Sequence, residues 1–244
     1  QAVGTPLIGM SQDGLAAFEP AFADELALIM AWAFNYLQRD ADHPGRDALP
    51  GTRWLRDEEG GSVYLRLSTR PLEQPEREID GVLREQIITG GYWLKPPAEG
   101  AELAIVYSGA VAPEALAAWE VLVEEVPGAG LLAVTSADRL NAEWTAAARA
   151  RKAGRMDATC HADRLLAPLA PDAGLVTVLD GHPATLGWLG SVRGHQVQAL
   201  GVEHFGQSGD IPDLYRHYGI DQDAIIDACA AALLQRVRRS RDLQ

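Results

Sequence analysis

The chain has 244 residues, 47% of them hydrophobic, and a formal net charge of -13 at pH 7. That length allows one large or two small domains with buried cores. The acidic excess opposes binding to nucleic acid or to anionic membranes, because like charges repel. No apolar run is long enough to cross a bilayer, and Cys160 and Cys229 do not have the spacing of zinc ligands. We therefore expect a cytoplasmic protein with no metal site of its own, and, because Gln1 is not an initiator methionine, a fragment of a longer polypeptide.

The first part of the chain predicts two helices and one strand. Apolar residues recur at three- and four-residue steps after Pro20, which indicates an amphipathic helix over residues 22–38. Residues 40–61 are polar and rich in proline and glycine, so we expect an irregular segment there. Alternating apolar residues predict a strand over 62–68, and a short helix is expected over 80–89.

A domain boundary is predicted at the segment Lys95–Gly100, because its two prolines cannot continue a helix or a strand ladder. We expect residues 1–94 and 95–244 to form separate domains. Strands and helices alternate beyond the boundary, which predicts an α/β fold with a mostly parallel sheet covered on both faces. The expected strands are 101–107, 131–135, 175–180 and 196–202, and the expected helices are 113–125, 137–153, 184–191, 211–218 and 221–238.

Two residues are candidates for binding a substrate. Arg70 follows the predicted strand 62–68, where its guanidinium could hold a carboxylate or phosphate through two hydrogen bonds. A surface ion pair with Glu73 or Glu76 is the slightly favoured alternative for Arg70. His204 follows a predicted strand and precedes a loop of small residues, where α/β proteins place functional groups. No residue of this chain is predicted to be catalytic.

Several segments, in order, resemble one enzyme family. They are Phe18–Met30, Val63–Pro71, Ile79–Leu94, the motif His204-Phe205-Gly206-x-Ser208 and the stop Tyr218-Gly219-Ile220-Asp221. Together they are similar to the C-terminal portion of homodimeric pyruvate dehydrogenases, which are thiamine-diphosphate enzymes of the transketolase superfamily. The resemblance implies that residues 1–94 are the C-terminal half of the pyrimidine-binding domain and that residues 95–244 form a transketolase C-terminal-like domain.

The resemblance also implies an activity for the parent protein. The parent would be an oxidoreductase that decarboxylates a 2-oxo acid on thiamine diphosphate and magnesium and acylates a lipoyl group of a partner acyltransferase. The family's magnesium motif and its ring-activating glutamate do not occur in this sequence, so the chain alone is expected to be inactive. Its own role would be to form the homodimer and to line the substrate entrance with Arg70 and His204.

Two alternatives remain open from the sequence. Gln207 stands where pyruvate dehydrogenases usually have arginine, and the Ser-Thr-Arg-Pro loop at 68–71 is closer to the Ser-Arg-Gln-Asn of transketolase. The parent could therefore be transketolase or a related ketol transferase, for which Arg70 is the candidate phosphate ligand. The other alternative is a stand-alone interaction module of the same fold with no catalytic role.

Overall fold

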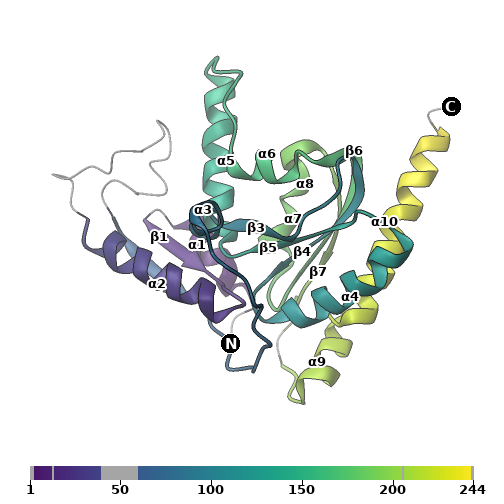
Figure 1. Cartoon of the computed structure of the whole chain (residues 1–244), viewed down its shortest axis with the longest axis horizontal. Coiled ribbons are helices and arrows are strands. Elements are labelled where there is room, and N and C mark those ends of the chain that lie inside the picture. The colour runs from purple at the N-terminus through teal and green to yellow at the C-terminus, as the bar shows by residue number, and fades with distance from the viewer. Residues whose placement is uncertain (1–2, 13, 40–59, 205, 243–244) are drawn as a thin grey trace.

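A five-stranded sheet is the centre of the computed structural model, which describes residues 3–12, 14–39, 60–204 and 206–242 (Figure 1). The strand order is β3-β5-β4-β6-β7. The strands are β3 (Gly91–Lys95), β4 (Ala101–Ser108), β5 (Gly130–Val134), β6 (Leu169–Leu179) and β7 (Gln196–Leu200). β4 to β7 are parallel to one another, and β3 is antiparallel to β5. The predicted α/β class with a mostly parallel sheet is confirmed.

Helices cover both faces of this sheet because its central strand is apolar on both sides. Leu103, Ile105 and Tyr107 of β4 pack in the same core as α4 (Ala112–Glu125) and α10 (Gln222–Asp242). The alternate residues of β4 pack in a second core with α5 (Ala137–Lys152) and α6 (His161–Leu166). Because successive side chains of a strand point to opposite faces, these two cores lie on opposite sides of the sheet. The continuous apolar run of β4 follows from this three-layer arrangement.

A smaller unit precedes the large sheet. Its two parallel strands are β1 (Leu15–Phe18) and β2 (Ser62–Leu65), and its main helices are α2 (Ala23–Leu37) and α3 (Gly81–Thr89). The Tyr92 hydroxyl of β3 donates to Glu25 Oε1 of α2 at 2.5 Å, in the buried contact between the small unit and the large sheet. The short elements of the chain are η1 (Thr5–Leu7), α1 (Ile8–Ser11), η3 (Gly109–Val111), α7 (Ala184–Gly187), α8 (Gly190–Arg193) and α9 (Ile211–Tyr218).

The structure differs from the sequence predictions at several elements. The strand expected over 62–68 ends at Leu65, and the helix expected over 184–191 is two short helices, α7 and α8. β6 begins at Leu169, six residues before the expected start, because the register between β4 and β6 shifts there and accommodates Pro171 and Asp172. The sequence patterns did not predict β1, β3 or α6. The irregular segment expected over 40–61 lies almost wholly outside the described residues.

The segment after β3 turns between two strands of one sheet. β3 ends at Lys95 and β4 begins at Ala101, so the two prolines lie in the connection between them. The division of the chain after residue 94 stays a prediction, and a division before residue 91 would keep β3 with the sheet to which it belongs. None of the helices in the described ranges is long and apolar enough to cross a membrane.

Candidate functional site at the carboxyl edge of the sheet

The carboxyl ends of the parallel strands bring polar residues together at one edge of the large sheet. β4 ends at Ser108, while Thr135 and Asp180 directly follow β5 and β6. In α/β folds, groups that bind ligands lie beyond these strand ends. The small unit packs against the same edge, because the Glu19 N–H donates to the Thr135 carbonyl at 2.8 Å. We therefore take this edge as the candidate site.

Glu19 is the most perturbed acid at this edge. It directly follows β1, and only 9% of its surface is exposed. The Arg66 guanidinium donates to Glu19 Oε1 and to the backbone carbonyl of Asp180. Burial raises the pKa of Glu19 to about 7, although the positive charge of Arg66 acts to lower it. A carboxyl group that titrates near neutral pH is suited to proton transfer, and it also links the small unit to the large sheet.

Substitution of Glu19 by glutamine should remove a pH dependence of stability. Because folding raises the pKa of Glu19 from 4.5, the protonated carboxyl stabilises the folded state. That stability is fully present below pH 4.5 and is lost as the pH rises through about 7. Relative to Glu19→Gln, the unmodified chain should lose about 2 kcal/mol of unfolding free energy between about pH 5 and about pH 8. Urea denaturation of both proteins at the two pH values measures this, and equal pH dependence would contradict it.

Arg70 lies in a paired and partly buried position. Its guanidinium donates to both carboxylate oxygens of Glu114 on α4, at 2.9 and 2.7 Å, and to the Ala110 carbonyl at 3.1 Å. It also lies over the Tyr215 ring, 5.4 Å from the ring centre. The bidentate bond to Glu114 raises the pKa of Arg70. The favoured prediction of an ion pair is therefore correct in kind but wrong in partner, since Glu114 takes the place expected for Glu73 or Glu76.

A line of polar contacts joins Arg70 to the Glu19 pair. The Tyr215 hydroxyl of α9 lies 3.5 Å from a carboxylate oxygen of Asp180, whose backbone carbonyl accepts from Arg66. Tyr215 is buried, and burial raises its pKa, so its hydroxyl stays protonated at neutral pH. This edge thus carries one connected network that runs from β1 to α4.

His204 lies apart from this network in a shallow depression. The depression has a volume of about 250 Å³, and His217 and Tyr218 of α9 also line it. The His204 side chain is exposed. Arg70 and His204 both lie beside α9, but no contact between them is found among the described residues. The structure therefore places the two candidates at separate points of one edge.

The described residues contain no cluster of metal-ligating side chains. Within the ranges that the structure describes, no group of three or more His, Cys, Asp or Glu side chains lies close enough together to hold a metal ion. Glu19, the acid with the most unusual pKa at this edge, is already paired with Arg66. The carboxylate of Glu19 is therefore not free to bind a metal ion.

Sequence reasoning missed Glu19, Arg66 and Asp180. β1 has only four residues, Leu-Ala-Ala-Phe, and this short run gave no strand signal that would have placed Glu19 at a strand end. Arg66 was assigned to the interior of a strand that in fact ends one residue before it. A charged residue at the end of an apolar run, such as Asp180 before Gly181, was the available signal.

The comparisons with known proteins point to one family. A family model described as the transketolase-like C-terminal domain matches residues 90–221. A mutant transketolase from Pichia stipitis aligns with a TM-score of 0.62 and 18% identity, over 96% of this chain and 27% of that one. The transketolase from Leishmania mexicana aligns with a TM-score of 0.63 and 17% identity, over 96% of this chain and 28% of that one. No curated protein sequence matches the chain.

A third solved structure differs in coverage. A split gene transketolase, described as an inactive β4 tetramer, aligns with a TM-score of 0.59 and 16% identity over 96% of this chain and 63% of that one. Identities this low establish the shared fold. The chain spans about a quarter of the length of the Pichia and Leishmania enzymes.

Proposed function

The chain belongs to the family of transketolase-like C-terminal domains, and from that membership we propose that it is the C-terminal part of a homodimeric, thiamine-diphosphate-dependent 2-oxo acid dehydrogenase of the pyruvate type. In this proposal residues 1–94 are the C-terminal half of the pyrimidine-binding domain, and residues 95–244 form the transketolase C-terminal-like domain. Thiamine diphosphate and magnesium would supply the decarboxylation chemistry in the parent protein. The described residues would bind neither, and their part would be to shape the entrance and to form the dimer.

The Arg70–Glu114 pair argues against Arg70 as the ligand of a sugar phosphate. The transketolase of Pichia stipitis has been solved in complex with sedoheptulose 7-phosphate. A phosphate ester needs a positive charge that is free to meet it. Both terminal nitrogens of Arg70 donate to the Glu114 carboxylate. The charge of the guanidinium that was expected to hold a sugar phosphate is therefore already neutralised.

Arg70 and His204 receive different roles in this proposal. His204 is exposed and would offer a polar contact to the substrate at the entrance. Arg70 would hold the start of α4 beside α9 and so shape the wall of the entrance. The substrate would be a small 2-oxo acid, and the macromolecular partners would be a second copy of the parent and a lipoyl acyltransferase.

The second candidate function is ketol transfer. Its support is that the similar structures named above are transketolases. The protein encoded by the complete reading frame separates the two candidates. We expect it to reduce ferricyanide with pyruvate or 2-oxobutyrate and to leave xylulose 5-phosphate unused as a ketol donor. Ketol transfer from xylulose 5-phosphate without oxidation of a 2-oxo acid would overturn the proposal.

The chain by itself should not bind the cofactor. The described residues provide no group of three or more metal-ligating side chains, and the sequence lacks the family's magnesium motif. Calorimetric titration of the 244-residue chain with thiamine diphosphate and magnesium should therefore give no saturable heat. Saturable binding with a micromolar dissociation constant would contradict the assignment of cofactor binding to other parts of the parent.

A further inference from the structure

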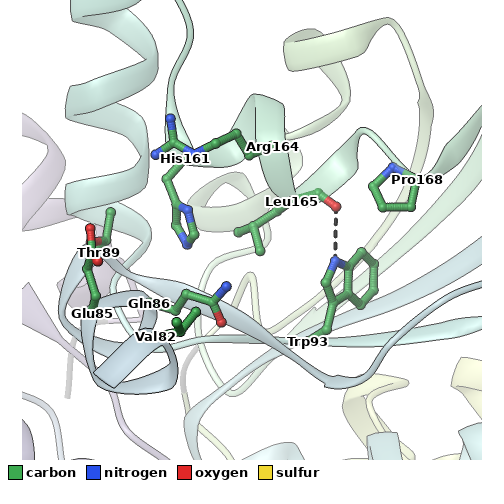
Figure 2. Close-up of a pocket in the computed structure, with 9 residues that line it drawn as sticks. All are labelled: Val82, Glu85, Gln86, Thr89, Trp93, His161, Arg164, Leu165 and Pro168. Carbon is green, nitrogen blue, oxygen red and sulfur yellow. Dashed lines mark hydrogen bonds between the residues drawn. The ribbon is translucent and has the colours of Figure 1, made fainter. Parts of the chain in front are cut away.

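A pocket separate from the carboxyl-edge site lies between α3 and α6 (Figure 2). Its volume is about 290 Å³, close to the lower limit for pockets that hold small organic ligands. It shares no lining residue with the Glu19, Arg70 or His204 clusters. The proposed function makes no use of it.

His161 presents a hydrogen-bond acceptor to this pocket. The residue is only 6% exposed, and its Nε2 lies 2.7 Å from the Gly91 carbonyl oxygen. A carbonyl oxygen only accepts, so Nε2 must carry the proton and Nδ1 must be the basic nitrogen. Nδ1 makes no hydrogen bond with any residue in the described part of the chain. Burial also lowers the pKa of His161, so its ring is neutral at pH 7 and Nδ1 keeps its lone pair.

The pocket has a polar end and an apolar end. Figure 2 shows Trp93, Leu165 and Pro168 on one side, with Glu85 and His161 on the other. The indole N–H of Trp93 is already bonded to the Leu165 carbonyl at 3.0 Å, so this residue offers its ring to a ligand and not its donor. An occupant must therefore be polar at one end and apolar at the other.

The charges at the polar end are of both signs. The Arg164 side chain is 57% exposed, and its only described partner, Glu143, is 3.7 Å away, beyond hydrogen-bond distance. Glu85 is exposed on α3 and supplies a carboxylate. A ligand that satisfies this end needs an anionic group for Arg164 and a cationic N–H donor for Glu85 and His161 Nδ1.

We propose that this pocket binds a free α-amino acid with a large apolar side chain, its carboxylate at Arg164, its ammonium at Glu85 and His161, and its side chain against Trp93 and Leu165. Such a zwitterion carries both charges and the apolar group on one small molecule. A 2-oxo acid of the same side chain lacks the ammonium donor and leaves Glu85 and His161 Nδ1 without a partner. The pocket thus distinguishes an amino acid from the corresponding 2-oxo acid.

Titration of the 244-residue chain with L-phenylalanine and with L-leucine tests the proposal. We expect saturable changes in Trp93 and His161 NMR signals, with a dissociation constant below about 1 mM for at least one of the two amino acids. Phenylpyruvate and phenethylamine, which each lack one charged group, should bind at least about tenfold more weakly than L-phenylalanine. Absence of saturation with both amino acids, or equal binding of phenylpyruvate, would overturn the proposal.

Two exposed substitutions separate the two charged contacts. Glu85→Gln should weaken L-phenylalanine about tenfold and leave phenylpyruvate unchanged, because only the ammonium contact is lost. Arg164→Gln should weaken L-phenylalanine to a similar degree and leave phenethylamine unchanged. Arg84→Gln and Glu124→Gln change the charge at exposed positions outside the pocket and serve as controls. If the controls weaken binding as much as the pocket variants, the ligand is held elsewhere and the proposal fails.

Discussion

Replacement of Gly109 by alanine should cost about 3 kcal/mol of unfolding free energy. Gly109 has a φ of +66°, a backbone conformation that residues other than glycine rarely adopt. A Cβ there would also lie 2.6 Å from Cγ and 2.8 Å from Cδ of Glu19, and it would meet Oε1 as well. Arg66 holds that carboxylate in place, so the clash cannot be relieved without breaking the bond between Glu19 and Arg66.

Gly100 is the matched control for this substitution. Its φ is +77°, and a Cβ at this position would meet nothing within 4 Å. Gly100→Ala should therefore cost only the backbone strain, about 1 kcal/mol. Urea denaturation of both variants gives the difference between them, which measures the contact with Glu19 alone. Equal losses in the two variants would show that Glu19 moves aside freely and that Arg66 does not hold it in place.

The second large effect concerns assembly, since the 244-residue chain should self-associate through α2. Met30, Phe34 and Leu37 are 39%, 59% and 52% exposed, and their spacing places them on one face of that helix. Apolar faces of this kind are usually covered by another surface.

Light scattering on a sizing column tests the self-association. The unmodified chain should elute as a dimer or a larger oligomer, and Phe34→Glu should give a monomer because it places a charge at the centre of the apolar face. Val121→Glu is the control, since Val121 of α4 is 47% exposed and lies on another helix. A monomeric unmodified chain, or dissociation by the control substitution alone, would show that α2 is not the interface.

The large sheet could be predicted because its strands are long apolar runs between clear turns. β4 and β5 are almost wholly buried, and their sequences show it directly. α6 gave no such signal, since Cys160 is its N-cap and cysteine is a rare cap, although its sulfur accepts from the Asp163 N–H. β3 was missed because it is a five-residue edge strand that directly follows α3 and pairs only with β5, about 40 residues further along the chain. Strand pairing between distant segments leaves little trace in a local pattern.

The sequence did not predict the ion pairs of the candidate site. His204 lines a shallow depression and Arg70 is paired with Glu114, and a role for either in substrate binding stays a prediction. The partner of Arg70, however, is 44 residues away in sequence, and Glu19 and Arg66 are 47 residues apart. An ion pair between distant segments is a property of the assembled fold, so a search among nearby acids found Glu73 and Glu76 instead of Glu114.

The antiparallel position of β3 determines how a recombinant C-terminal domain would behave. A polypeptide that began at Lys95 would lack four of the five residues of β3, and the edge of β5 would then be open. All five residues of β5 are buried in the complete chain, so the new edge would be an apolar strand with unpaired backbone groups. Such edges add strands from other molecules and seed aggregates. A version that starts before Gly91 would keep β5 covered and should be the better choice for expression and crystallisation.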